Sequence, residues 1–430
     1  MLLLGVAVAD ITPEWPLDLC GFMSRTGQWT DMRSRLETQV FVFGEVEDGA
    51  SVARSVLVCS DLVWWGPDLV RDLKARLARS LGIPPAAVLL HATHTHGGPA
   101  MSALFSPLIG RPDPAYMAST LETVQRTSLV ASRSLEPVLV RRGRATAGIG
   151  VNRRLVRDGA CVMAPNPAGP IDREVTTVRF VRADGSTAGL FVHFACHPSV
   201  CADRSISADY PGAMRLHLRK TSDADAPIGF LQGCSGDVRA NLAVRGEFRD
   251  GTNADVDRLG RLVARSVQSA LGEDELIECG SISHARSVVD LKVARPDRSL
   301  LRKLAPSAGI VGEWSRRLLA SPDGSPSSVQ LELSSIVLGR QLRFIGFNAE
   351  VSVEYGLYIK RRSGGSTLPL GYTNGMIGYL VTAQQLVEGG YEPLESYRYL
   401  YRAGPFTSDV ETAVKSKIDA SVPSVLKWQR

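Results

Sequence analysis

The sequence lacks most of the features that mark membrane, redox and nucleic-acid-binding proteins. None of its apolar runs approaches the roughly 18 residues that a membrane-spanning helix needs. Its seven cysteines form no CxxC pair, which predicts reduced thiols and a cytoplasmic protein. The 49 basic and 44 acidic residues are scattered without a Lys/Arg block, so we expect no nucleic-acid partner. No basic residue precedes the apolar run at 1–10, so that run predicts a first strand rather than a signal peptide.

What the chain does have is the apolar spacing of a mixed α/β fold. Its 44% apolar and 22% charged residues are typical of a globular protein. Apolar residues at intervals of three and four predict helices at 67–81, 114–135, 210–220 and 253–271. Short apolar runs between turn residues predict buried strands at 52–59, 86–90, 175–181, 189–195 and 228–232.

The second half of the chain has a different pattern, because its residues tend to alternate between apolar and polar. This alternation predicts hairpin strands at 288–293, 329–338 and 341–347, with a turn at 338–341. The expected class is therefore α/β, with mixed sheets covered by helices and a hairpin-rich later half. The loop-like stretch 321–328 separates motifs that serve one site, so we interpret residues 1–430 as a single catalytic domain.

Histidine is scarce, yet five of the seven histidines lie at the ends of two apolar runs. His94 and His96 follow the first run, and His197 follows the second. We expect His94 and His96 to project from the same side of an extended chain. A catalytic zinc takes about three or four N or O ligands and keeps one position open, so this density predicts a metal site. The other two, His91 and His193, are interpreted as hydrogen-bonded core histidines.

Other motifs place polar residues where predicted elements begin or end. A glycine-punctuated loop at 233–241 follows a strand, and Glu350 follows a hairpin strand. Asp209 precedes a helix, where it would cap the helix or orient a histidine. A Gly/Tyr-rich segment occupies 371–391. Each pattern alone is also typical of ordinary loops and aromatic packing, so only their order is informative.

In this order the motifs resemble those of the N-terminal catalytic domain of the neutral/alkaline ceramidases and their shorter bacterial relatives. The resemblance runs from Ala9-Asp10-Ile11-Thr12-Pro13 to the 379–391 segment. It implies a zinc held by the first histidine of an HTH motif, the histidine of an HP motif, a glutamate and a tyrosine, which are here His94, His197, Glu350 and Tyr379. It also implies a reacting centre lined by His96, Arg153 and Tyr391, with the backbone of Gly21 beside it.

One departure from the family concerns the attacking group. The ceramidases carry a serine in a GDxSPN motif, whereas this chain reads Gly236-Asp237-Val238-Arg239-Ala240-Asn241. Arginine stays protonated and cannot act as a nucleophile, so we expect attack by zinc-activated water, with His96 or the neighbours of Glu350 handling the proton. Arg239 would bind a substrate carboxylate or the developing oxyanion, or else form a structural salt bridge. Asp237, Asn241 and Gly21 are expected to contact the substrate.

A second departure concerns the substrate. The chain ends soon after the tyrosine segment and shows no export signal, so we expect no accessory domain and a smaller, more polar amide than a membrane lipid. The predicted activity is zinc-dependent hydrolysis of a non-peptide C–N amide bond in a small N-acyl compound. Alternatives are a zinc-dependent esterase or lactonase of the same family and a non-catalytic, metal-stabilised binding protein. Metallo-β-lactamase folds fit less well, because they follow the HxH pair closely with Asp-His, whereas Gly97-Gly98-Pro99 follows His96 here. Amidohydrolase barrels also fit less well, because they place the pair near the N-terminus and need a late Asp after a strand.

Overall fold

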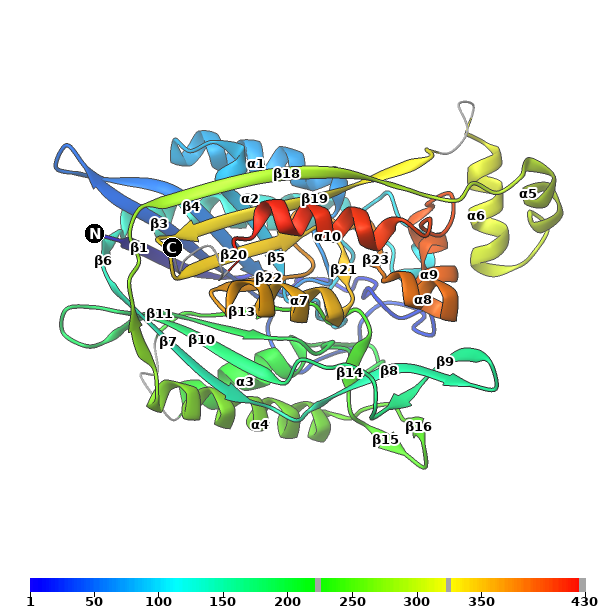
Figure 1. The fold of residues 1–430 in the computed structure, drawn as a ribbon, viewed down its shortest axis with the longest axis horizontal. Coiled ribbons are helices and arrows are strands. Elements are labelled where there is room, and N and C mark those ends of the chain that lie inside the picture. The colour runs from blue at the N-terminus through cyan, green and yellow to red at the C-terminus, as the bar shows by residue number, and fades with distance from the viewer. Residues whose placement is uncertain (221–225, 322–325, 425–430) are drawn as a thin grey trace.

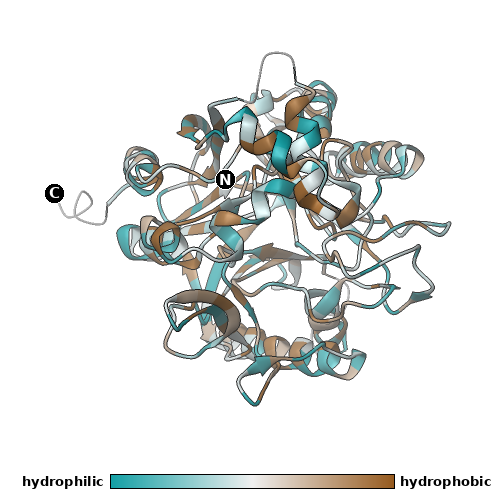
Figure 2. Cartoon of the chain, turned by 90° about the vertical axis from the view of Figure 1, so that its right-hand side faces the viewer, coloured by the Kyte–Doolittle hydropathy of each residue, from teal (hydrophilic) through white to brown (hydrophobic). Residues whose placement is uncertain are grey.

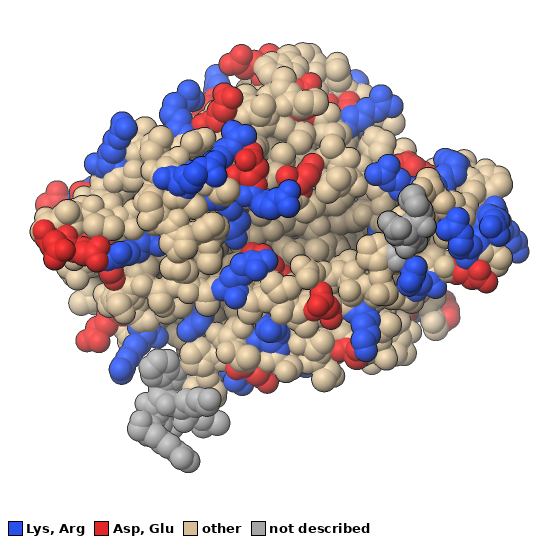
Figure 3. All heavy atoms as spheres, turned by 90° about the horizontal axis from the view of Figure 1, so that it is seen from above, with Lys and Arg blue, Asp and Glu red and all other residues tan. Residues whose placement is uncertain are grey.

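The computed structural model describes residues 1–220, 226–321 and 326–424, and it has the expected α/β architecture (Figure 1). Three larger sheets form the body of the molecule, and helices cover their outer faces. None of the described helices is long and apolar enough to cross a lipid bilayer. Charged side chains of both signs are mixed over the face seen in Figure 3, in keeping with the scattered charges of the sequence.

The first sheet has the order β5-β4-β3-β1-β6 and holds the N-terminal strand. Helices α1 and α2 pack on one of its faces. Pro at the first position of α1 and a left-handed Gly82 at its end, with φ 68°, explain why the helix limits could be predicted. The strands and helices are β1 (Leu3–Asp10), β3 (Glu37–Glu47), β4 (Ala50–Ser60), β5 (Val88–Ala92), β6 (Glu136–Pro137), α1 (Pro67–Leu81) and α2 (Pro114–Arg133).

The second sheet has the order β13-β11-β10-β7-β17 and is covered by α3 and α4. Strand β11 is buried along its whole length, as the unbroken apolar run predicted. A capping box between Thr252 and Asp255 starts α4. The elements are β7 (Leu139–Thr146), β10 (Glu174–Val181), β11 (Thr187–Phe194), β13 (Ile228–Gln232), β17 (Glu275–Ile277), α3 (Asp209–Arg219) and α4 (Asn253–Gly272).

The third sheet, of order β18-β19-β20-β22, is the hairpin-rich part of the chain. Helices α7 and α10 pack against it (Figure 1). The β19–β20 hairpin pairs Leu338 with Leu342, and Gly339 in its turn has φ 63°. The elements are β18 (Ile282–Lys292), β19 (Ser328–Leu338), β20 (Leu342–Phe347), β22 (Thr367–Leu370), α7 (Val353–Ser363) and α10 (Val410–Ser421).

The remaining elements are short. The small sheets join β14-β8-β9, β21-β23, β15-β16 and β12-β2. Helices α5 and α6 project from one end of the molecule, and Figure 2 views the chain from that end. The bounds are β2 (Asp31–Met32), β8 (Gly150–Arg157), β9 (Ala160–Asn166), β12 (Ser205–Ile206), β14 (Val238–Ala240), β15 (Ala243–Val244), β16 (Glu247–Phe248), β21 (Glu350–Val351), β23 (Tyr379–Leu380), α5 (Arg298–Leu304), α6 (Gly309–Leu319), α8 (Ala383–Glu388) and α9 (Tyr391–Leu394), with 3₁₀ turns η1 (Pro85–Ala87), η2 (Pro107–Ile109) and η3 (Ser396–Leu400).

Most predicted elements agree with the structure to within two residues, but some do not. The strand expected at 288–293 begins six residues earlier, because β18 runs over Ile282–Lys292 and pairs with β19 along its whole length. Helices α5, α6, α7 and α10 were not predicted, since their apolar stripes lie among polar and glycine-containing segments. The predicted loop at 321–328 falls partly outside the described residues.

An aromatic core joins the three larger sheets. The ring of Phe191 in β11 lies 4.1 Å from Phe41 in β3 and 5.4 Å from Phe344 in β20, measured between centroids. All three side chains are fully buried. Truncating such a residue to alanine costs about 3–5 kcal/mol, so each contributes a large share of the stability. This core sets the relative positions of the strands whose ends carry the site.

The loops that follow β5 and β11 meet at one place. The amide of His96 donates to the carbonyl of Pro198 at 3.3 Å, and Ser207 donates to Gly97 at 3.0 Å. A Cβ on Gly97 would lie 2.3 Å from the Ser207 carbonyl oxygen, so only glycine allows this approach. The segment after β22 completes the junction, because Ala92 donates to the carbonyl of Tyr372 at 3.1 Å. Ligands in α/β folds commonly bind where strand ends meet in this way.

Candidate metal centre

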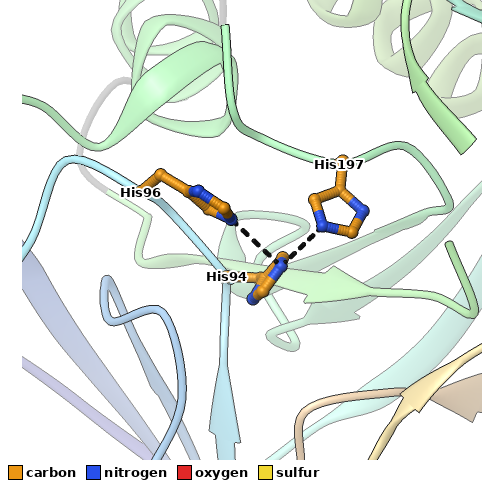
Figure 4. A group of neighbouring side chains, drawn as sticks. All are labelled: His94, His96 and His197. Atoms are coloured by element: carbon orange, nitrogen blue, oxygen red, sulfur yellow. Dashed lines mark hydrogen bonds between the residues drawn. The ribbon is translucent and has the colours of Figure 1, made fainter. Parts of the chain in front are cut away.

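Three histidines converge at this junction (Figure 4). The Nε2 atom of His94 lies 2.8 Å from Nε2 of His197 and 3.3 Å from Nε2 of His96. The possible ligand atoms of the three side chains all lie within 4.8 Å of one another. His94 has a left-handed φ of 66°, so the chain is not extended there as we had expected. The kink nevertheless brings the His94 and His96 rings together.

The hydrogen bonds behind the rings determine which nitrogens face the junction. Nδ1 of His94 lies 2.7 Å from the carbonyl oxygen of Val63, and Nδ1 of His197 lies 2.9 Å from that of Ser235. A carbonyl oxygen can only accept, so both Nδ1 atoms carry the proton. Burial, followed by repulsion from His94, lowers the pKa of His197 to about 4, which keeps it neutral near pH 7. Two Nε2 lone pairs therefore face each other, an arrangement that a cation between them would stabilise.

Glu350 adds a negative charge to the same point. Its Oε2 atom lies 3.4 Å from Nε2 of both His94 and His197, and this oxygen is buried without a hydrogen-bond donor. A buried carboxylate oxygen and two imidazole lone pairs thus converge with no donor among them. This donor set fits a divalent metal ion such as zinc.

Tyr379 is held beside Glu350 by backbone pairing and by Arg153. Strands β21 and β23 pair in parallel, with Glu350 opposite Tyr379. Arg153 donates from Nη2 to the Tyr379 hydroxyl at 3.0 Å and from Nε to Oε1 of Glu392 at 2.8 Å. The Tyr391 ring lies 5.8 Å from the Tyr379 ring, and its hydroxyl makes no hydrogen bond with the described residues. The structure therefore brings both tyrosines and Arg153 to the junction.

His96 is held on the opposite side of the cluster by the segment at 20–25. Gly21 has φ 105°, and a Cβ there would lie 2.4 Å from Nδ1 of His96. The Phe22 ring packs edge-on against His96 at 4.8 Å, and Arg25 donates to the His96 carbonyl at 2.7 Å. Nδ1 of His96 is buried without a hydrogen-bond partner. His96 is thus fixed through its backbone and ring faces, and Nδ1 is the ring nitrogen that has no partner among the described residues.

Arg239 lies next to His197 but forms no salt bridge. The two residues pair across a parallel bridge at the edge of β14. Within the described chain no carboxylate lies within 4.0 Å of its guanidinium, which instead stacks over the Phe248 ring at 4.4 Å. Burial, followed by the positive charge of Arg153, lowers the pKa of Arg239. Of the roles expected for this residue, the structural salt bridge is the one that the structure contradicts.

Two other expectations for polar residues need correction. Asp237 is fully buried, and its carboxylate accepts from the Val353 amide and the Gln385 side chain, both at 2.8 Å, so it is inaccessible to a substrate. Asn241, from the same loop, is solvent-exposed, and its expected contact with a substrate stays a prediction. Asp209 neither caps α3 with its side chain nor contacts a histidine; it accepts from the amide of Val200 at 2.9 Å and so holds the loop after His197.

Several residues at the site were missed by sequence analysis. The Tyr372 ring stacks on His94 at 3.8 Å between centroids. Asp61 accepts from Thr93 at 3.2 Å and forms a fully buried ion pair with Arg215, which supports the backbone before His94. These contacts join residues far apart in the chain, and no local pattern could have signalled them.

The remaining two histidines of the motifs lie outside the cluster, as expected. His91 accepts at Nε2 from the Gln232 amide at 2.8 Å, and its Nδ1 lies 2.9 Å from the Thr373 hydroxyl. His193 lies 2.9 Å from the carbonyl oxygen of Pro369. Both rings are fully buried, and both nitrogens of His91 have partners, whereas Nδ1 of His193 has none among the described residues.

Comparison with known proteins places this geometry in context. No protein-family model matches the sequence. A neutral ceramidase from Mycobacterium tuberculosis (strain ATCC 25618 / H37Rv) is 26% identical over 262 residues, which is 56% of this chain and 41% of that protein. The sequence match thus spans less than half of that relative's length.

Solved structures match over nearly the whole chain. The crystal structure of neutral ceramidase from Pseudomonas aeruginosa has a TM-score of 0.76 and 19% identity, covering 98% of this chain and 75% of that one. A structure described as ceramidase complexed with C2 has a TM-score of 0.75 and 18% identity, covering 98% and 76%. The resemblance predicted from the motifs is confirmed, and the chain has the fold of the neutral ceramidases.

Proposed function

We propose that the protein is a zinc-dependent hydrolase that cleaves the C–N amide bond of a small N-acyl compound. The observation that carries the proposal is the convergence of two imidazole lone pairs and an unpartnered Glu350 oxygen on one point. Tyr379, paired with Glu350, would be the fourth ligand. The resemblance to neutral ceramidases supports an amide as the bond cleaved.

A zinc ion held there would polarise the scissile carbonyl and activate water at neutral pH. His96, with one unpartnered nitrogen, would take a proton from the attacking water and deliver it to the leaving amine. The free hydroxyl of Tyr391 would donate to the oxygen that gains charge in the transition state. Arg153 would keep Tyr379 in place, since it is itself held by Glu392.

We also propose that residues 1–430 act as one catalytic unit. The site draws on Gly21, which lies between β1 and β2, and on Tyr391, which begins α9. The same groups would also be able to attack an ester or a lactone. An amide and an ester with the same acyl chain should therefore be compared in one experiment.

The test combines metal analysis with turnover. We expect about one zinc per chain in the wild-type protein, and its loss together with activity in His197→Ala. Glu350→Gln, which removes only the charge, should weaken zinc binding at least tenfold in a chelator competition. His217→Ala is a matched control, because that histidine lies on α3 in an exposed ion pair with Asp257 at 2.8 Å. Zinc bound without release of amine or alcohol would instead favour the metal-stabilised binding protein.

A further inference from the structure

Arg239 is a cation without an anion at the edge of the candidate metal centre. It pairs directly with His197 in a parallel bridge, and residues paired in this way project from the same side of a ladder. Neighbouring strands lie about 4.8 Å apart, so the Arg239 side chain starts one strand spacing from a proposed zinc ligand. Phe248, in the β15–β16 hairpin that follows β14 in the chain, lies against the Arg239 side chain.

The other arginine of the site is neutralised, whereas Arg239 is not. Arg153 has Glu392 at 2.8 Å, and the carboxylate of Glu392 also binds Arg154 at 2.6 Å. Arg239 is half-buried, and no hydrogen bond or ion pair reaches its guanidinium from the described residues. Asp250 attracts it, but not within ion-pair distance. Holding a partly desolvated cation beside a second arginine is unfavourable unless an anion joins it.

Phe248 keeps the guanidinium in position. The ring face covers one side of the planar group at 4.4 Å, which offsets part of the cost of its burial. The five N–H donors lie in the plane of the guanidinium, and none of them is bonded to an acceptor in the described part of the chain. Their geometry matches the two oxygens of a carboxylate. An arginine placed and oriented in this way is suited to bind an anionic group.

We propose that Arg239 forms an anion subsite beside the metal centre, so that the substrate is an N-acyl compound with a carboxylate or similar charge close to its scissile bond. The proposal rests on the amide hydrolase activity proposed above and narrows its substrate class. An amide whose amine part is a small amino acid would satisfy it, because its carboxylate lies only a few bonds from the scissile carbon.

Binding is tested first with compounds that cannot be hydrolysed. In 4-oxoundecanoate the amide nitrogen of N-octanoylglycine is replaced by a methylene group, and 4-oxoundecanamide differs from it only in charge. Calorimetric titration of the zinc-loaded wild-type protein should show the acid binding roughly 10- to 100-fold tighter than the amide. Arg239→Gln should abolish this preference, and Arg239→Lys should keep part of it. Arg245→Gln, on the exposed turn of the same hairpin, should retain it in full.

Turnover is then measured on N-octanoylglycine and N-octanoylglycinamide. Selective, Arg239-dependent binding of the acid without cleavage of either amide would support the subsite and refute the hydrolase. Cleavage of both amides without charge-selective binding would support the hydrolase and overturn the subsite. Equal binding of the two ketones by the wild-type protein, or a preference that survives in Arg239→Gln, overturns the proposal. A further outcome is that Arg239→Gln slows the hydrolysis of both amides equally, with no preference for the acid in the binding experiment. That result would show that Arg239 stabilises the oxyanion rather than binding a substrate anion.

Discussion

Replacing Glu392 by glutamine should destabilise the fold and disturb the site at the same time. Its carboxylate is 3% exposed and binds Arg153 at 2.8 Å and Arg154 at 2.6 Å, from two different oxygens. Without the negative charge, two buried guanidinium groups lose their main partner. Breaking a buried ion pair from one side costs about 3–5 kcal/mol, and two cations depend on this one carboxylate. We therefore expect the free energy of unfolding to fall by at least about 3 kcal/mol at pH 7.

The pH dependence gives an independent check on this reasoning. Although burial opposes ionisation, Arg153 and Arg154 lower the pKa of Glu392 below its usual value of 4.5. A group with a lowered pKa in the folded state stabilises the protein above its unfolded pKa, and this contribution is lost as the pH falls through the folded pKa. The difference between the wild-type protein and Glu392→Gln should therefore be full above about pH 5 and shrink below pH 4.5.

Urea unfolding at pH 7 and at pH 4 would measure both effects. The matched control is Glu388→Gln, because Glu388 is more exposed and forms an ion pair with one arginine, Arg154, at 3.2 Å. We expect Glu388→Gln to lower the free energy of unfolding by less than about 1 kcal/mol. In addition, Glu392→Gln should lower activity, since Arg153 would no longer be held against Tyr379. Equal, small losses of stability in the two variants would refute the argument that Glu392 neutralises two buried cations.

Two further substitutions probe the supports of the histidine cluster. Gly21→Ala would place a methyl group 2.4 Å from Nδ1 of His96 at a φ of 105°, so the rate should drop at least tenfold while the zinc content measured by elemental analysis stays at the wild-type level. Loss of zinc in Gly21→Ala would indicate that His96 is itself a zinc ligand. Asp61→Ala would leave the fully buried Arg215 without its closest carboxylate and should cost about 3–5 kcal/mol in urea unfolding. An unfolding midpoint unchanged from that of the wild-type protein would show that Glu37, 3.5 Å from Arg215, is a sufficient partner.

Local signals in the sequence determined the elements that frame the site. Pro67 and Gly82 mark the two ends of α1, and the capping box at Thr252 marks the start of α4. The unbroken apolar run before His197 predicted a strand buried on both faces, and β11 is such a strand. These features depend on neighbouring residues alone, because capping, backbone angles and apolar periodicity act within one or two turns or along one strand.

Contacts between distant segments were decided only by the tertiary structure. The sequence places Asp237 and Arg239 two residues apart in one loop, but Asp237 lies in the turn before β14 and is buried against the start of α7, whereas Arg239 lies within β14 and faces Phe248. His94 has a left-handed backbone, and the Tyr372 ring stacks on its side chain. Tyr372 comes from a segment almost 280 residues further along the chain. Whether a charge is neutralised depends on which residues the fold brings within about 4 Å of it, and local sequence does not encode that distance.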